Sequence, residues 1–89
     1  MQFTFSPTFL QQYEGLAPDI KERVGKALQK FKENPRAGSL RFHRLTDVKP
    51  PVWKIDVLPN RSWQVAMHIT GDTCELIAVC SHKDMDKLF

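Results

Sequence analysis

The sequence lacks the features that mark several large classes of protein. No apolar stretch approaches the ~20 residues needed to cross a bilayer, and no basic segment followed by an apolar run marks a signal peptide. It also lacks a Gly-rich phosphate loop, a nucleophile elbow and a carboxylate pair. We therefore expect a cytoplasmic protein with no membrane partner.

Cysteine is scarce, with only Cys74 and Cys80 in the chain. If both lie on one strand, their spacing of six points them to the same face, too far apart for a disulfide. They are therefore predicted to be free thiols in a reducing compartment. The three histidines, His43, His68 and His82, do not have the spacing of metal ligands. We expect no metal and no other cofactor.

The size and charge of the chain limit its fold and its partners. Its 89 residues are too few for two hydrophobic cores, which predicts one domain over residues 1–89. A hydrophobic content of 42% is ordinary for a globular protein. The net charge of +3 favours a nucleic acid or an acidic protein as partner.

The first half of the chain predicts one strand and two helices. Gln2–Phe5 alternates polar and apolar residues, as a short strand does. Ser6 and Pro7 start a helix that ends near Gly15, because serine caps a helix and proline fits its first position. A second helix begins at Pro18 and ends at Asn34-Pro35. Its apolar residues recur every three or four positions and form one stripe: Ile20, Val24, Ala27, Leu28 and Phe31.

The second half predicts four short strands, at residues 40–45, 52–58, 63–69 and 74–80, separated by turn signals. The fold class is therefore α+β, with an N-terminal strand, a two-helix hairpin and a four-stranded antiparallel meander packed on the helices. The N-terminal strand is expected at a sheet edge or beside a late strand. Residues 81–89 form a polar tail with room for a helical turn or more.

Alternation along the strands predicts one apolar and one cationic face of the sheet. The inward set is Trp53, Ile55, Val57, Trp63, Val65, Met67 and Ile69. Lys54, Asp56, Gln64 and His68 are expected to point outward. Basic residues on or beside the strands outnumber acidic ones; they are Arg41, Arg44, Lys49, Lys54 and Arg61. Such a face suits an anionic partner, of which a nucleic-acid backbone is the commonest.

This order of elements, together with three local strings, resembles the RelE/ParE superfamily of bacterial toxins. The strings are RFHRL at 41–45, VWKIDV at 52–57 and NRSWQVAMHITGDTCELIAVCSHKD at 60–84. The resemblance covers essentially the whole chain. It implies a toxin that cleaves messenger RNA on the ribosome, using the RNA 2′-hydroxyl as nucleophile and no metal. The alternative is the same fold without catalysis, as a DNA gyrase poison or an inactive toxin-like binding module.

The same resemblance assigns catalytic roles. Lys54 matches a position where the family carries basic residues on the tryptophan-containing strand, and it would stabilise the phosphate. Arg61 matches an arginine that contacts RNA. His82 follows the last strand, where relatives often have histidine or arginine, and an imidazole suits proton transfer near neutral pH. Gln64 departs from the arginine that many members carry there. No aromatic is in register with the terminal tyrosine of relatives, and the nearby Phe89 cannot transfer a proton, so the phosphate clamp and the proton donor differ from the common pattern.

Further residues are predicted to bind RNA around this site. Arg41 and His43 share a face and flank the groove, and His68 is expected to face the same cleft as Lys54. The full predicted RNA-binding set is Arg41, His43, Arg44, Gln64, His68 and Lys83. The expected partners are a cognate antitoxin and, for the enzyme, messenger RNA and the ribosome. A third class, a basic single-stranded nucleic-acid binder, requires exposed aromatics between the basic residues, whereas here the aromatics follow the apolar faces.

Overall fold

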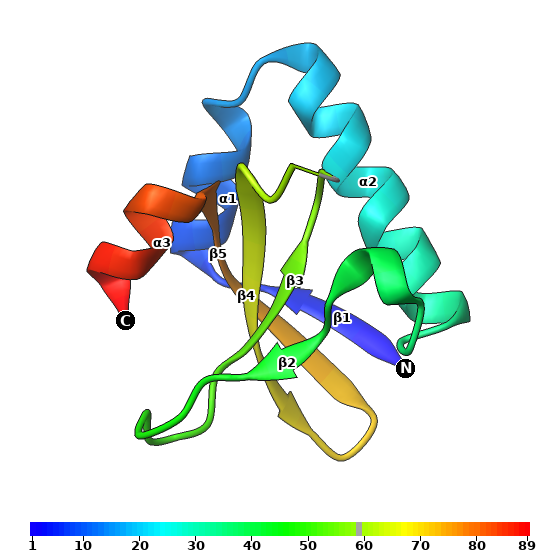
Figure 1. The fold of residues 1–89 in the computed structure, drawn as a ribbon, viewed down its shortest axis with the longest axis vertical. Coiled ribbons are helices and arrows are strands. Elements are labelled where there is room, and N and C mark those ends of the chain that lie inside the picture. The colour runs from blue at the N-terminus through cyan, green and yellow to red at the C-terminus, as the bar shows by residue number, and fades with distance from the viewer. Residues whose placement is uncertain (59) are drawn as a thin grey trace.

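The computed structural model describes residues 1–58 and 60–89 and shows a five-stranded sheet with helices on both faces (Figure 1). The elements are β1 (Gln2–Phe5), α1 (Pro7–Glu14), α2 (Pro18–Glu33), η1 (Gly38–Leu40), β2 (His43–Arg44), β3 (Trp53–Asp56), β4 (Trp63–Thr70), β5 (Thr73–Ser81) and α3 (His82–Leu88). None of the helices in these described ranges combines the length and apolar character of a membrane span.

The two N-terminal helices follow the local signals of the sequence. Ser6 caps α1, since its hydroxyl accepts a hydrogen bond from Phe9 N at 3.0 Å, and Pro7 occupies the first turn. Helix α2 begins at Pro18 and ends at Glu33, and its apolar stripe is buried. The two predicted helices are confirmed.

The strands are arranged in the order β1-β5-β4-β3-β2. The four late strands form the predicted antiparallel meander, and β1 lies at the edge, parallel to β5. Where β1 ends, α1 and its cap provide hydrogen-bond partners for backbone groups of β5. The Gln12 side chain accepts from Val79 N at 2.8 Å, and the Ser6 hydroxyl donates to Ile77 O at 3.2 Å. The predicted α+β architecture is therefore confirmed.

The strand predicted at residues 40–45 is wrong in its extent. Gly38–Leu40 forms a turn of 3-10 helix, and Arg41 follows it with a left-handed φ of 49°. An L-residue in that conformation cannot continue a strand, so pairing begins only at His43. β2 consequently contains two residues, with His43 opposite Lys54 and Arg44 opposite Trp53.

A β-bulge changes which residues of β5 share a face. Met67 pairs with Leu76, whereas the preceding Ala66 pairs with Ala78, so Ile77 is an extra residue in β5. Cys74 consequently packs in the core below α1 and α2, and Cys80 packs on the opposite side of the sheet. The expectation that the two thiols would share a face is wrong because simple alternation breaks at the bulge.

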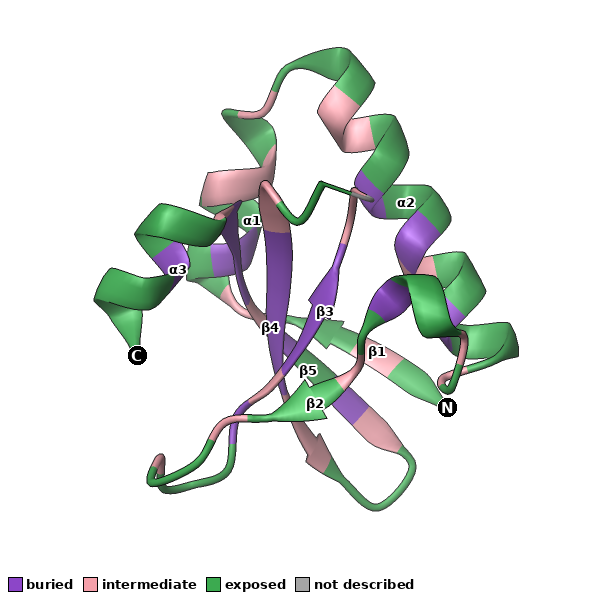
Figure 2. Cartoon of the chain, viewed as in Figure 1, coloured by how far each residue is buried: buried purple, intermediate pink, exposed green. Residues whose placement is uncertain are grey.

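The sheet has two faces of different character. The helix-pair face, covered by α1 and α2, carries the main core, which includes Phe31, Ile55 and Leu76. The α3 face carries a smaller cluster formed by Val52, Ala66, Ala78, Cys80 and Met85. Buried segments of β3 and β4 therefore lie between helices on both sides (Figure 2). The prediction of an open cationic face is wrong because the C-terminal tail folds into α3 and covers part of it.

Candidate active site

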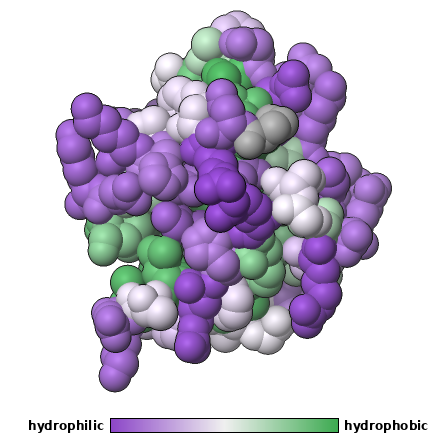
Figure 3. All heavy atoms as spheres, viewed as in Figure 1, coloured by the Kyte–Doolittle hydropathy of each residue, from purple (hydrophilic) through white to green (hydrophobic). Residues whose placement is uncertain are grey.

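The α3 face has a small apolar centre with polar side chains beside it. Lys54 and Asp56 are buried there on β3, and Gln64 is buried there on β4, which also carries Ala66. Hydrophilic side chains run down the middle of the molecule over β3 and β4 in the view of Figure 3. Polar groups buried on a sheet face need partners. Each partner here is another charged or polar side chain, which distinguishes this face from the helix-pair face.

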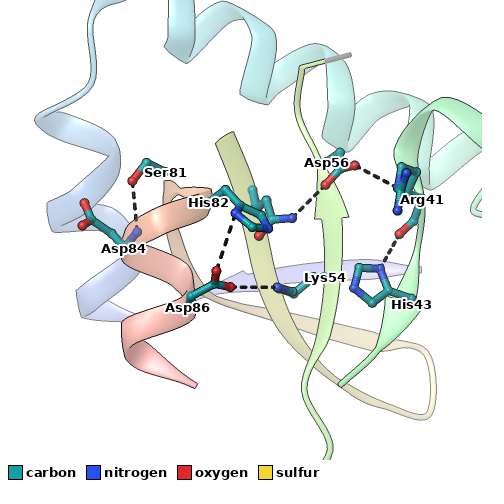
Figure 4. Close-up of polar contacts among 9 residues, drawn as sticks. Arg41, His43, Lys54, Asp56, Ser81, His82, Asp84 and Asp86 are labelled. Carbon is teal, nitrogen blue, oxygen red and sulfur yellow. Dashed lines mark hydrogen bonds and ion pairs between the residues drawn. The ribbon is translucent and has the colours of Figure 1, made fainter. Parts of the chain in front are cut away.

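Lys54 is buried on the α3 face rather than exposed to solvent. Only 8% of its side chain is exposed, and its Nζ lies 4.0 Å from Asp86 Oδ1. Figure 4 shows Lys54 pointing from β3 toward α3, where Asp86 is located. The prediction that Lys54 points away from the main core is correct, but its expected exposure is wrong because α3 covers this part of the sheet.

His82 begins α3 and reaches the same carboxylate. Its Nδ1 lies 3.6 Å from Asp86 Oδ2, one helical turn further along. Its backbone N donates to Ser62 O at 2.8 Å, which joins the start of α3 to the turn before β4. The helix is capped by Ser81, whose hydroxyl accepts from Asp84 N at 3.1 Å. Lys54 and His82 therefore converge on Asp86 from two different elements (Figure 4).

A second polar group lies beside this one. Gln64 Nε2 donates to Asp56 Oδ1 at 2.9 Å, and Arg41 Nε lies 3.4 Å from Asp56 Oδ2. Gln64 was predicted to be outward and free to meet RNA; it does lie on the α3 face but is 3% exposed and bonded to Asp56. Its Oε1 is buried and has no hydrogen-bond partner among the described residues.

The predicted RNA-binding residues on the strands fall at different places. His43 is exposed on the α3 face opposite Lys54, and its Nδ1 lies 2.6 Å from Arg41 O. His68 is on the same face of β4, but its Nδ1 lies 2.9 Å from Pro51 O in the β2–β3 loop. Arg44 is exposed and pairs with Trp53, which places it on the opposite face at the sheet edge.

Two predicted residues are exposed near the start of α3. Arg61 is in the β3–β4 turn, with a left-handed φ of 63°, and precedes Ser62, which accepts the His82 backbone bond. Lys83 follows His82 in the first turn of α3. Within residues 1–58 and 60–89, no ion pair joins either side chain to the Lys54–Asp86 pair. Arg61 and Lys83 are therefore sequence neighbours of Ser62 and His82, but neither takes part in the contacts within the Lys54–Asp86–His82 cluster.

The two thiols lie on different faces of the sheet, and the pKa of each reflects its surroundings. Burial raises the pKa of Cys74, in the main core, to about 11. Burial also raises the pKa of Cys80; the Asp84 carboxylate raises it further, and the Lys54 ammonium acts in the opposite direction. Both thiols are therefore in their protonated, weakly reactive form at neutral pH. Across the described ranges, no three His, Cys, Asp or Glu residues gather as a metal site would require.

Sequence reasoning missed Asp86 and assigned no role to Asp56. The spacing of His82 and Asp86, four apart in a segment able to form a helix, was the available signal for their contact. The alternation of β3 already placed Asp56 on the same side as Lys54. The contact of Asp86 with Lys54 depends on where α3 docks, which no local pattern indicates.

Comparison with solved structures identifies similar folds. A chain of the YoeB/ParE toxin from Agrobacterium tumefaciens matches with a TM-score of 0.75 and 16% identity, covering 92% of this chain and 99% of that chain. A chain of the E. coli DinJ-YafQ toxin-antitoxin complex matches with a TM-score of 0.76 and 11% identity, covering 94% of both chains. A chain of the Methanococcus jannaschii RelB-RelE antitoxin-toxin complex matches with a TM-score of 0.68 and 16% identity, covering 96% of both.

Sequence comparison gives no match, either among protein-family models or among curated proteins. The likeness is therefore one of architecture, extending over nearly the full length of the chain and of each similar structure. The strand order, the helix pair and the C-terminal helix together give this chain the RelE-like toxin fold.

Proposed function

We propose that this chain is the toxin of a toxin–antitoxin pair and that it cleaves messenger RNA on the ribosome. One observation supports the catalytic part: Lys54 from β3 and His82 from α3 converge on a single carboxylate. A cation and an imidazole brought together on one sheet face are the groups that phosphodiester cleavage needs. The RelE-like fold supports the toxin part.

The proposed reaction requires a base, an acid and a stabilising charge. The 2′-oxygen of RNA attacks the adjacent phosphorus and loses its proton to a base, while the bond to the 5′-oxygen breaks and that oxygen gains a proton. His82 would transfer a proton, because an imidazole can serve as acid or base near neutral pH. Lys54 would stabilise the additional negative charge on the phosphate. Removing one such stabilising donor typically costs about 10²–10³ in kcat.

The exposed basic residues around the cluster would hold the rest of the RNA. Arg61 lies beside the His82 end of the cluster, whereas Arg41 and His43 lie beside the Lys54 end. Lys83 and His68 would extend this contact at the periphery, whereas Arg44 could meet RNA only where the strand passes around the sheet edge, because it lies on the opposite face. Such phosphate contacts weaken steeply as salt rises.

The alternative is a non-catalytic role for the same fold, as a DNA gyrase poison or an inactive toxin-like binding module. It is favoured by the pairing of the cations with carboxylates: Lys54 with Asp86, and Arg41 with Asp56. Gln64, where many relatives carry arginine, is occupied with Asp56 and adds no positive charge. The resting site thus has less free positive charge than the sequence suggested.

Both forms of the proposal include an antitoxin. The similar E. coli and Methanococcus jannaschii structures are complexes of a toxin with its antitoxin. A partner segment for this chain would be acidic and often helical, because the exposed surface is basic. It would lie across the sheet or the helix pair and bury the cationic groups.

Induction of the chain in growing bacteria tests the proposal. We expect translation to stop before replication, with codon-phased cuts in messenger RNA mapped by primer extension. The cuts should disappear in a Lys54→Met, His82→Ala double variant. Lys26→Met provides the matched control, because it removes a lysine from the exposed side of α2, where Lys26 contacts Glu22. Intact messages accompanied by DNA-damage signalling would reject cleavage and support the gyrase alternative.

A further inference from the structure

Helix α3 is attached to the sheet by few contacts. Of its seven residues, all described, Met85 alone is buried. Met85 packs against Ala66, Ala78 and Cys80, whose small side chains form a shallow seat. The remaining attachments are the backbone bond to Ser62 and the charged contacts of Asp86. A short helix held by one apolar side chain belongs to the part of a protein that opens at low free-energy cost.

The proposed catalytic lysine is closed off at the end that faces this helix. Only 8% of the Lys54 side chain is exposed, and the carboxylate of Asp86 lies 4.0 Å from its Nζ, where an RNA phosphate would have to bind. The nearest anion is Asp86, whose two carboxylate oxygens face Lys54 and His82 separately. A phosphate that contacts both residues has to occupy the space that this carboxylate now fills.

We propose that α3 is a lid hinged at His82, whose backbone bond to Ser62 keeps that residue at the site, and that Asp86 is its latch, an internal carboxylate in the place of the RNA phosphate. The proposal rests on the RNA-cleaving function proposed above. Asp86 keeps the resting site closed, and RNA opens it when a phosphodiester replaces the carboxylate between Lys54 and His82. The chain therefore acquires its cationic site only upon binding RNA.

The geometry of the latch makes this exchange feasible. The side chain of Asp86 is 59% exposed, and its oxygens lie 3.6 Å and 4.0 Å from His82 and Lys54, beyond ordinary hydrogen-bond length. Because the carboxylate itself faces water and both distances are long, these contacts contribute little free energy, typically below ~1 kcal/mol. A phosphodiester offers more than one acceptor oxygen, and RNA adds contacts with the basic residues nearby.

Binding of a short single-stranded RNA that carries a 2′-O-methyl group at every position, which prevents cleavage, tests the latch. Fluorescence anisotropy at low salt would compare wild type, Asp86→Asn and Asp84→Asn. Asp84 is the matched control because it lies on the same short helix and its replacement changes the net charge equally. We expect Asp86→Asn to bind roughly three- to fivefold more tightly than Asp84→Asn.

The outcomes separate this inference from the proposed function. Equal affinities of the two variants, or weaker binding by Asp86→Asn, would overturn the latch. The proposed function would survive that result if Lys54→Met still weakened binding and abolished messenger cleavage. Absence of binding by every variant would also overturn the latch, because removing Asp86 should uncover the site; messenger cleavage would then decide the function independently.

The thiol of Cys80 provides a second measurement that needs no variant. Cys80 lies under Met85 of α3, whereas Cys74 lies in the main core and serves as an internal reference. Saturating RNA should increase the rate at which a maleimide labels Cys80 relative to Cys74, detected by peptide mass spectrometry. An unchanged or slower Cys80 rate would show that α3 stays closed and would overturn the lid.

Discussion

The two faces of the sheet are built on different physical principles. The helix-pair face is closed by large apolar side chains such as Phe31, Ile55 and Leu76, all fully buried. The α3 face has alanines at its centre and, beside them, the buried Lys54, Asp56 and Gln64. Burial of apolar area stabilises a fold at about 25 cal/mol per Å², whereas burial of a charge costs free energy unless it is paired. The comparison indicates that stability resides mainly on one face, whereas the proposed chemistry uses the other.

The polar face departs from the pattern of a purely structural sheet. On a purely structural sheet face, apolar residues favour the strand, fill the core and leave no polar group without a partner. Residues that break this agreement are expected at functional sites. Here the departure comprises a lysine under a short helix and a buried Gln64 oxygen without a partner among the described residues. Variants on the two faces should therefore separate stability from activity.

The largest effect on stability is expected from Phe31→Ala on the helix-pair face. Phe31 is fully buried, stacks against Phe3 and packs at a tilt against Phe42, so truncation leaves a cavity. We expect the free energy of unfolding, measured by urea denaturation, to fall by about 3–5 kcal/mol. Leu88→Ala serves as the control because Leu88 is exposed on α3. A loss below about 1 kcal/mol for Phe31→Ala would contradict this division between the faces.

An intermediate effect is expected from Gln64→Leu on the α3 face. This change removes the donor to Asp56 Oδ1 and leaves a buried carboxylate oxygen unsatisfied, which costs about 1–3 kcal/mol. The same change in an Asp56→Asn background should cost less, because a neutral amide is cheaper to leave unpaired. Urea denaturation of the four proteins in this double-mutant cycle measures the coupling. Additive losses would mean that the hydrogen bond contributes nothing to stability.

Local signals made most of the fold predictable. Ser6 and Pro7 specify the start of α1 by capping and by ring geometry, and the stripe of α2 specifies its buried side. The alternation of β3 and β4 correctly predicted that Ile55, Val65 and Met67 face the helix pair, although Trp63, from the same predicted set, is not part of that core. The helix starts, the α2 stripe and the strand alternation depend only on residues close together in the sequence, so they can be predicted without knowledge of the tertiary structure.

The α3 face was less predictable because it depends on contacts between distant segments. The left-handed Arg41 shortens β2, the bulge at Ile77 separates the two thiols, and the docking of α3 buries Lys54. The sequence named Lys54 and His82 as candidates, and both lie close to one carboxylate, yet it could not supply Asp86 as the residue between them. Tertiary packing rather than propensity decides each of these features.

The smallest effect on stability is expected from Lys54→Met, which makes the sharpest test of the comparison. Methionine keeps the unbranched shape of lysine without its charge, and replacing one partner of a buried pair is harmful when the other is left buried and charged. Here the other partner, Asp86, is 59% exposed and regains water. We therefore expect the free energy of unfolding to change by less than about 1 kcal/mol, in either direction.

A lysine retained for chemistry should be dispensable for folding, as trade-offs between stability and activity predict. A loss of 3 kcal/mol or more in urea denaturation, about that of breaking a buried pair, would instead make Lys54 a structural residue and remove the division between the two faces.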